Sequence, residues 1–532
     1  MANKTLQIRI ESILGGRSPS TNFGTADQFQ LGFGIDPSLP NDSMDSDYTT
    51  FPGGLIRPVA VTQAGTTTQA SPLWIISNPK ATATAQSFFI YDAQGSAYTT
   101  TGTGSVSNLS DRGTLSGSSG NGCEYYDNFI YFAKNTTISR YGPLDASDSP
   151  DFTEDYWTGT LGKTALSNTG YPDSFETIPN HVLKRHSDGK LYVADVVGNQ
   201  GTIHYISTTK TTYEGDTDNG STYDAVNVGY GLYPTAMESY GTELVVAFYE
   251  GANTGNQQTP AKLAFWDTTS NNVNKIVWVE FPDPLITAMK NVNGILYVIS
   301  GQPDFYGLRV SRFVGGSSFE EVALLEDYSP TLPGGVAKRG ENLVFGTGSA
   351  TLVSGGTVYS LGLPKKLSTG LFTVALCGGN FVTALATSPG NLNDQALVMG
   401  VNNSASVGSG IYDPGGVIDT DFPPIWWSQR FRIGQPFKIT KIRIPVARAI
   451  TTNMEITPTI YTDDGEGDYY PGGSTNGFPV INNTNYSGKR NIVMRPENMT
   501  GENNFWLELK WTGSVICSAG LPITIEYELI DD

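Results

Sequence analysis

The chain has few charged residues, few cysteines and few histidines for its length. Charged residues make up 16% of its 532 residues, and it contains 3 cysteines and 3 histidines. Cys123, Cys377 and Cys517 are odd in number and far apart, which predicts neither a disulfide framework nor a zinc site. No stretch approaches the roughly 20 apolar residues of a membrane span, and the start, MANKTLQIRIESILGG, lacks the apolar segment of a secretory signal. We therefore expect a chain made in a reducing cytoplasm, without a membrane span.

Positive charge is also scarce. The sequence has 32 basic and 51 acidic residues, a formal net charge of -19. An acidic surface repels phosphate backbones, which argues against a protein that stores nucleic acid or reads its sequence.

Long helical patterns are missing as well, because no long stretch places apolar residues at spacings of three and four. Hydrophobic residues make up 38% of the chain and aromatic residues 11%, and there are 61 glycines. This composition favours short strands and turns over helices, which prefer Ala, Leu, Glu and Lys. We therefore predict an all-β protein with enough apolar residues for a sizeable core.

A β-hairpin pattern recurs along the first four-fifths of the chain. In ITAMKNVNGILYVIS, residues 286–300, Asn293-Gly294 separates two apolar runs, and this pair tolerates the positive φ that a tight hairpin turn requires. Similar hairpins recur at intervals of about 40 to 60 residues, the length of one blade of a β-propeller. The second strands of the predicted hairpins begin at seven apolar anchors: Leu73, Phe129, Leu191, Leu244, Leu296, Leu343 and Phe381.

These anchors predict a β-propeller of seven blades, in which each blade buries its faces on its neighbours. The first strand of each hairpin is rich in small apolar residues, as expected for a crowded strand near the axis. We expect Pro58-Val59-Ala60-Val61 to be the first strand before Leu73, and Val374-Ala375 to be the first strand before Phe381. The alternative is a β-sandwich whose periodicity is accidental.

The composition changes after the repeats. Residues 411–425 are predicted to be a linker, and residues 426–532 contain strands with period-two alternation, such as Phe505, Leu507, Leu509 and Trp511. This pattern predicts a C-terminal antiparallel β-sandwich or jelly roll with one buried face per sheet. The predicted domains are an N-terminal strand and extended arm at 1–55, a propeller at 56–410, the linker and the sandwich. Leu6, Ile8 and Ile10 form a strand that completes the last blade or pairs with the second domain.

The sequence offers few candidates for catalysis or metal binding. His181, His186 and His204 are interpreted as ordinary strand and turn residues, and two acidic loops are interpreted as solvated turns rather than calcium sites. The predicted inner strands, such as Thr235-Ala236-Met237 and Thr287-Ala288-Met289, are nearly free of the acids that propeller glycosidases use. We therefore predict no catalytic, cofactor-binding or metal-binding residues. The acidic loops contain Glu214, Asp216, Asp218 and Asp224, and Asp463, Asp464, Glu466 and Asp468.

Several aromatic residues of the C-terminal region suit either sugar stacking or packing. Trp426-Trp427 stands at the start of the second domain, and Tyr469, Tyr470 and Tyr486 lie in predicted loops. Aromatic rings at a domain start usually pack in a core or hinge, so we favour packing.

Three short segments resemble the opening of tailed-bacteriophage structural proteins, in which a Gly-Gly segment, a Pro-Ser stretch and Gly-x-x-Arg-Pro precede a β-propeller. They are LQIRIESILGGRSPS, DQFQLGFGIDPSLP and FPGGLIRP. WSQRFRIGQPFKITKIRIPV resembles the strand that starts the C-terminal sandwich of such proteins. The resemblance implies a non-enzymatic virion protein of the tail, the tail nozzle or the head-to-tail connector, with head decoration still open.

The expected partners follow from this resemblance. They are other virion proteins and further copies of the same chain, which assemble into an oligomeric ring through the arm and the sandwich. The expected location is the virion, after synthesis in the host cytoplasm, and DNA at most passes through without specific binding because like charges repel. A carbohydrate- or receptor-binding propeller is the main alternative, and a cellular interaction scaffold is the third.

Overall fold

The structure is a computed structural model of the whole chain. It describes residues 5–13, 16–17, 28–35, 55–56, 58, 61–68, 70–80, 86–101, 109–115, 119–134, 137–144, 150–157, 182–197, 200–206, 226–250, 259–269, 273–302, 305–326, 331–347, 356–362, 370–377, 381–387, 397–402, 410–414, 423–462, 469–470, 478–496 and 499–530. Nearly all regular structure in these residues is β-strand, as predicted. None of the described helices is long and apolar enough to cross a membrane.

The chain forms two compact units that are each built from distant parts of the sequence. The first unit contains Met1–Thr62, Val358–Cys377 and Pro414–Asp532. The second contains Gln63–Thr357 and Gly378–Asp413. This division puts the N-terminal strand with the C-terminal region, whereas the sequence pattern predicts residues 1–55 to be a segment of their own.

Seven four-stranded sheets follow one another along the described residues. The first three are β6 (Pro72–Ser77), β7 (Gln86–Asp92), β8 (Ser96–Thr101) and β9 (Leu109–Thr114); β10 (Ser119–Tyr126), β11 (Phe129–Lys134), β12 (Thr137–Gly142) and β13 (Asp151–Trp157); and β14 (Val182–Arg185), β15 (Leu191–Val197), β16 (Gln200–Ile206) and β17 (Val226–Tyr230). The fourth and fifth are β18 (Leu232–Tyr240), β19 (Glu243–Glu250), β20 (Ala261–Trp266) and β21 (Val277–Phe281); and β22 (Leu285–Val292), β23 (Ile295–Gln302), β24 (Phe305–Gly315) and β25 (Ser318–Glu326). The sixth and seventh are β26 (Val336–Arg339), β27 (Asn342–Thr347), β28 (Gly356–Gly362) and β29 (Gly370–Cys377); and β30 (Phe381–Thr387), β31 (Leu397–Asn402), β32 (Gly410–Pro414) and β5 (Val61–Thr67).

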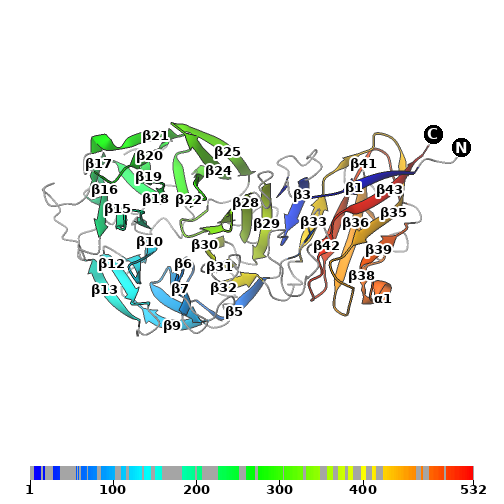
Figure 1. Cartoon of the computed structure of the whole chain (residues 1–532), viewed down its shortest axis with the longest axis horizontal. Helices are drawn as coiled ribbons and strands as arrows, with labels where there is room; N and C mark the ends of the chain where they lie inside the picture. The colour runs from blue at the N-terminus through cyan, green and yellow to red at the C-terminus, as the bar shows by residue number, and fades with distance from the viewer. Residues whose placement is uncertain are drawn as a thin grey trace. The chain divides into compact units, whose positions relative to one another are not determined.

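The inner strands, the first strand named for each sheet, contact one another in a closed cycle. Each of β6, β10, β14, β18, β22, β26 and β30 contacts the next, and β30 contacts β6. Figure 1 shows β6, β10, β18 and β22 near the middle of this group, and β9, β13, β17 and β21 at its periphery. This arrangement is propeller-like, in agreement with the β-propeller character predicted from the repeats.

The Asn293-Gly294 hairpin is confirmed. Asn293 and Gly294 have φ values of 53° and 85°, and Val292 pairs with Ile295 across the turn between β22 and β23. Leu296 and Val298 on the second strand are buried in one apolar cluster with Val245 and Leu263 of the preceding sheet. The hairpin is therefore stabilised by its neighbour, because a lone two-stranded hairpin buries too little apolar surface in water.

The first and last predicted repeats are wrong by one strand. Leu73 and Phe381 lie on inner strands, β6 and β30, rather than on second strands. The strand predicted before Leu73 falls partly on β5, the outer strand of the seventh sheet, and Val374-Ala375 falls on β29, the outer strand of the sixth. Inner and outer strands look alike in sequence. The pattern of apolar residues therefore does not show which of two neighbouring sheets a strand joins.

The last sheet is closed by a strand from before the first sheet, since β5 pairs with β32. The predicted linker therefore begins too early. Ile411 and Tyr412 of β32 pair with Gly400 and Met399 of β31. The Asp413-Pro414-Gly415-Gly416 run suggested a linker, but the two apolar residues before it complete a sheet.

The first unit contains two larger sheets and one small sheet. A five-stranded sheet has the order β1 (Thr5–Ile10), β43 (Ile523–Leu529), β35 (Phe437–Pro445) and β39 (Asn491–Met494), with β40 (Met499–Gly501) also paired with β35. An eight-stranded sheet has the order β2 (Gly16–Arg17), β3 (Gln28–Phe33), β33 (Ile425–Ser428), β41 (Asn504–Trp511), β36 (Glu455–Thr462) and β37 (Tyr469–Tyr470), with β34 (Phe431–Arg432) on β41 and β38 (Ile481–Asn482) on β36. The small sheet pairs β4 (Leu55–Ile56) with β42 (Ala519–Gly520). One short helix, α1 (Asn483–Tyr486), follows β38, and one 3-10 turn, η2 (Val273–Lys275), precedes β21.

One apolar cluster contains residues of both larger sheets. It contains Ile442 and Ile525 from the five-stranded sheet and Trp426, Leu507 and Trp511 from the eight-stranded sheet, all fully buried. The period-two alternation of β41 is thus confirmed on its core face. The opposite face differs from the prediction, because Trp506 and Glu508 are also buried rather than solvated.

The N-terminal strand takes the second of its two predicted positions. Leu6, Ile8 and Ile10 of β1 pair antiparallel with Tyr527, Ile525 and Ile523 of β43. Residues 28–33 likewise form β3 and pair with β33. The described strands at the N-terminus are therefore parts of the first unit's sheets.

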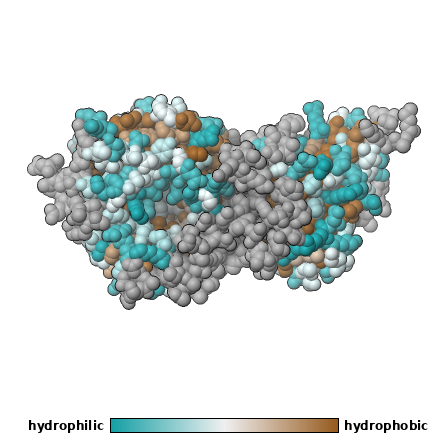
Figure 2. All heavy atoms as spheres, in the orientation of Figure 1, coloured by the Kyte–Doolittle hydropathy of each residue, from teal (hydrophilic) through white to brown (hydrophobic). Residues whose placement is uncertain are grey.

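Several large apolar side chains of the second unit are exposed. Val277 and Trp278 on β21 are 59% and 37% exposed, and Leu324 on β25 is 48% exposed. Figure 2 shows hydrophobic atoms gathered in the region where Figure 1 labels β21 and β25. An outer strand with exposed apolar residues is a surface that other proteins commonly cover.

Candidate functional site

All seven inner strands line one central cavity of about 340 Å³ in the second unit. Its walls are polar and apolar in about equal measure, with Leu183, Met237 and Met289 among the apolar lining residues. Its charged residues are Glu124, Lys184, Glu238, Lys290 and Lys338, one from each of β10, β14, β18, β22 and β26. The cavity is the strongest candidate for a functional site, because it is concave and brings several charged groups together beside apolar side chains, as ligand-binding pockets do.

A repeated β-bulge shapes the inner strands around this cavity. The pairing register shifts at Thr235, Thr287 and Thr383 on β18, β22 and β30. Each threonine is fully buried, and its hydroxyl donates to a carbonyl of the paired strand, at 3.4 Å, 3.4 Å and 3.2 Å respectively. Each threonine hydroxyl at a bulge is therefore hydrogen-bonded within its own sheet. The alanine that follows each threonine is small and leaves room at the centre of the group of inner strands.

A three-residue ion cluster crosses three neighbouring inner strands. Lys184 Nζ lies 3.3 Å from Glu124 Oε2 and 3.2 Å from Glu238 Oε2. The three side chains are only 17%, 21% and 8% exposed. Both cavity carboxylates are thus committed to one ammonium group, which offsets the cost of taking these charges out of water.

The lysine pKa values reflect this arrangement. Burial lowers the pKa of Lys184, but the carboxylates of Glu124 and Glu238 outweigh it, so the net shift is upward. The pKa of Lys290 is lowered, first by the nearby Lys184 ammonium and then by burial. Lys184 is therefore held firmly charged, whereas Lys290 carries its charge at a cost.

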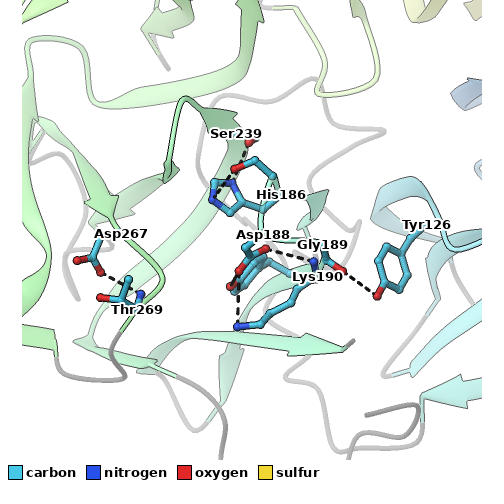
Figure 3. A network of polar contacts seen from close by, with 10 residues as sticks. Tyr126, His186, Asp188, Gly189, Lys190, Ser239, Asp267 and Thr269 are labelled. Atoms are coloured by element: carbon cyan, nitrogen blue, oxygen red, sulfur yellow. Dashed lines mark hydrogen bonds and ion pairs between the residues drawn. The ribbon is translucent and has the colours of Figure 1, made fainter. Parts of the chain in front are cut away.

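The turn ends of the inner strands are joined to their neighbours by hydrogen bonds. Figure 3 shows Tyr126 OH donating to Gly189 O at 3.0 Å and His186 Nδ1 lying 2.8 Å from Ser239 Oγ. The Asn291 amide donates to Ser239 O at 3.0 Å, and the Thr387 hydroxyl donates to Lys338 O at 2.9 Å. These bonds connect successive sheets and hold the rim of the cavity in place.

Two of the three histidines lie in the described residues, and both form hydrogen bonds within the protein. His186 and His204 are buried, and His204 Nε2 lies 3.0 Å from Thr202 Oγ1. Burial lowers the pKa of His186, against the opposing effect of Asp188. His181 lies outside the described residues. The carboxylates of both acidic loops, which were the candidate calcium ligands, also lie outside them. Among the described residues, no group of three or more His, Cys, Asp or Glu side chains is placed to hold a metal ion.

The aromatic residues of the C-terminal region divide into core and network positions. Trp426 is fully buried in the core of the first unit. Trp427 donates through Nε1 to Glu508 Oε2 at 2.7 Å, and Tyr461 OH donates to the same oxygen at 3.2 Å. The ring of Tyr461 stacks on Trp506 with centroids 5.1 Å apart. Tyr486 on α1 is buried, while the side chains of Tyr469 and Tyr470 are outside the description.

The charged residues of the cavity were not predicted from the sequence. The predicted inner-strand segments Thr235-Ala236-Met237 and Thr287-Ala288-Met289 stop one residue short of Glu238 and Lys290. The three other charges, Glu124, Lys184 and Lys338, lie on other inner strands. The available signal was a charged residue directly after a small apolar pair in several repeats. That signal is weak without the structure. In a strand with alternating apolar and polar residues, a charged residue is expected on the solvent-facing side.

Comparison with known proteins gives no family. No protein-family model matches this sequence, and no curated protein matches it. The chain is similar to an exo-β-1,3-galactanase from Phanerochaete chrysosporium (10% identity, covering 78% of this chain and 96% of that one, TM-score 0.31) and to virginiamycin B lyase from Staphylococcus aureus (11%, 67% and 99%, TM-score 0.40). It is also similar to the WD40 domain of Pan2 from Neurospora crassa (10%, 66% and 95%, TM-score 0.36). At these identities and TM-scores, the similarities carry no argument about the activity, ligands or partners of this chain.

Proposed function

We propose that this chain is a non-enzymatic structural component of a bacteriophage virion, in the tail, the tail nozzle or the head-to-tail connector. In this proposal the seven sheets are the blades of a seven-bladed β-propeller, and the two larger sheets of the first unit form a β-sandwich. The protein acts by assembly, as a homo-oligomeric ring in contact with other virion proteins.

The main observation in favour of a non-enzymatic role is the ion cluster of Glu124, Lys184 and Glu238. A propeller glycosidase needs two carboxylates free to act as acid and as base or nucleophile. In the central cavity both carboxylates lie within 3.3 Å of the same ammonium group. Carboxylates paired in this way favour a structural role.

Two further features support a role in assembly. The sequence segments that resemble phage structural proteins occur in the same order as in those proteins, with LQIRIESILGG at the start and WSQRFRIG before the last strands. The exposed Val277 and Trp278 on β21 offer an apolar outer strand to a partner. A second copy of this chain or another virion protein would bury these side chains.

The direct experiment is mass spectrometry of purified phage particles, combined with light scattering of the full chain. We expect the chain in stoichiometric amounts in particles and an oligomer in solution. A strictly monomeric chain that is absent from particles would contradict the proposal. Removal of residues 1–55 is not a clean test, because it deletes β1 and β3 from the sheets of the first unit.

A carbohydrate- or receptor-binding role is the alternative function, and head decoration is the alternative position in the virion. The observation that favours glycan binding is the pair of half-buried rings, Trp427 and Tyr461, which both donate to Glu508, since partly exposed aromatic rings suit sugar recognition. The test is a glycan array with the full chain and with Trp427→Ala. Specific binding that is lost in the variant would favour this role over the structural one.

A further inference from the structure

The central cavity has an excess of positive charge in a strongly acidic protein. Its charged lining consists of three lysines and two glutamates, whereas the chain as a whole carries a net charge of -19. The surplus lies at Lys290 and Lys338 on the neighbouring strands β22 and β26, because Lys184 is already paired with both carboxylates. Within the described part of the chain, neither Lys290 nor Lys338 forms an ion pair.

The surroundings of Lys290 make this surplus costly. Its side chain is half-buried, and its pKa is lowered by the Lys184 ammonium, by burial and by Lys338, with only partial opposition from Glu238 and Glu124. A half-buried ammonium near two others binds an anion favourably, because the anion relieves the repulsion and accepts a charge-assisted hydrogen bond. Lys338 is exposed, so the pair reaches from solvent into the cavity.

The walls next to these lysines indicate what kind of anion fits. Ala288, Met289, Val336 and Ala337 line the cavity on the same two strands. Three ammonium groups and two carboxylates leave a surplus of one positive charge, which a ligand with one negative charge would balance. A ligand with an apolar part would also match the apolar side chains of these two strands. Phosphate has no apolar part, and its second charge would exceed the surplus.

We propose that the central cavity binds a small organic carboxylate, with its carboxylate between Lys290 and Lys338 and its apolar body against Ala288, Met289, Val336 and Ala337. The site is independent of the proposed assembly role, since a virion protein and a cellular protein would bind such a ligand equally. No covalent step is involved. The ligand makes ion pairs with two lysines and buries its hydrocarbon part.

The test is calorimetric titration of the full chain with butanoate at constant ionic strength, with butanamide and inorganic phosphate as comparisons. We expect butanoate to bind and butanamide and phosphate to bind at least about tenfold more weakly, since charge-assisted hydrogen bonds carry the affinity. Lys290→Met should weaken butanoate binding by at least about tenfold, and Lys338→Met should also weaken it. Lys275→Met, which removes an exposed lysine of η2 outside the cavity, should leave binding unchanged.

Several results would overturn the proposal. They are absence of butanoate binding, equal binding of butanamide, phosphate binding as tight as butanoate, and unchanged binding in Lys290→Met. A second measurement does not depend on the variants. A crystal of the chain soaked with 4-bromobutanoate should show anomalous bromine signal in the central cavity, and bromine found only elsewhere would refute the site.

Discussion

At the scale of single residues, the central cavity separates two kinds of lysine. Lys184 is held between two carboxylates, whereas Lys290, one sheet beyond Glu238, carries a charge that its neighbours oppose. The same side chain thus stabilises one inner strand and imposes a cost on another. Opposite effects of the same substitution are therefore expected at the two positions.

Replacing Lys184 with Met should destabilise the second unit by about 3 kcal/mol, because two largely buried carboxylates lose their only cation in the cluster. Lys290→Met should leave the stability unchanged or increase it. Urea unfolding followed by hydrogen exchange of peptides from residues 63–357 measures both. Arg312→Met is the control, since Arg312 pairs with Glu320 at the surface and its loss should cost no more than about 1 kcal/mol. Equal losses for Lys184→Met and Lys290→Met would contradict this description of the cavity.

His186 should make stability depend on pH. Burial lowers its pKa below the value of about 6.5 in an unfolded chain, so protons bind the unfolded state more readily. Its contribution to stability is complete above pH 6.5 and falls as the pH drops from about 6.5 toward the lower folded pKa. Urea midpoints between pH 8 and pH 5 should decline more steeply for the native chain than for His186→Asn.

The comparison isolates His186 because Asp188 and Lys190, the charged groups that affect its pKa, remain in both proteins. Identical pH profiles of the two proteins would show that the imidazole titrates as it does in the unfolded chain. A steeper decline in the variant would reverse the sign and equally contradict the prediction.

At the scale of secondary-structure elements, each hairpin depends on the sheet beside it. Leu296 is the second residue of β23, the second strand of its hairpin, and is fully buried against residues of two sheets. The turn residues Asn293 and Gly294 define the hairpin locally through their positive φ values. The hydrophobic contact between sheets supplies most of its stability, because apolar burial outweighs what a two-residue turn contributes.

Leu296→Ala should therefore cost about 2 to 5 kcal/mol, from lost apolar burial and the cavity left behind. Leu324→Ala is a matched control, because Leu324 lies on β25 of the same sheet and is 48% exposed. Its effect should stay within about 0.5 kcal/mol. The same hydrogen-exchange measurement reports both, and a similar loss for the two variants would mean that Leu296 does not pack between sheets as described.

At the scale of the whole molecule, the ring of sheets is completed by residues distant in sequence. The inner strands contact one another in a closed cycle, and β5 supplies the outer strand of the last sheet after a separation of more than 300 residues from β32. Pairing the two ends in one sheet removes two free edges and makes opening of the ring cost backbone hydrogen bonds as well as apolar contacts.

Two adjacent prolines at Gln63 and Ala64 should weaken this closure. Successive N–H groups of a strand point in opposite directions, so one of the two substitutions removes a hydrogen-bond donor from the pairing with β32. We expect a loss of about 3 kcal/mol or more and faster hydrogen exchange in β30 to β32. Gln63→Ala keeps both donors and should leave exchange unchanged. Unaltered exchange in the double-proline chain would contradict closure by β5.

Much of the fold was predictable from local sequence. The Asn293-Gly294 turn, the all-β class, the repeated hairpins and the alternation of β1 and β41 are properties of residues close together in the chain. The errors concern partners. Phe381 was assigned to a second strand and residues 411–414 to a linker, because membership of a sheet depends on which distant strand lies alongside. The charged residues of the cavity were missed for the same reason.

Local residue patterns specify most strands, the turns and the apolar face of each strand, since these follow from backbone sterics and side-chain period. Long-range packing specifies that β5 joins β32, that β1 joins β43, and that five charged residues line one cavity: Glu124, Lys184, Glu238, Lys290 and Lys338. Such placements depend on the summed burial and hydrogen bonding of segments hundreds of residues apart, and no local pattern encodes that sum.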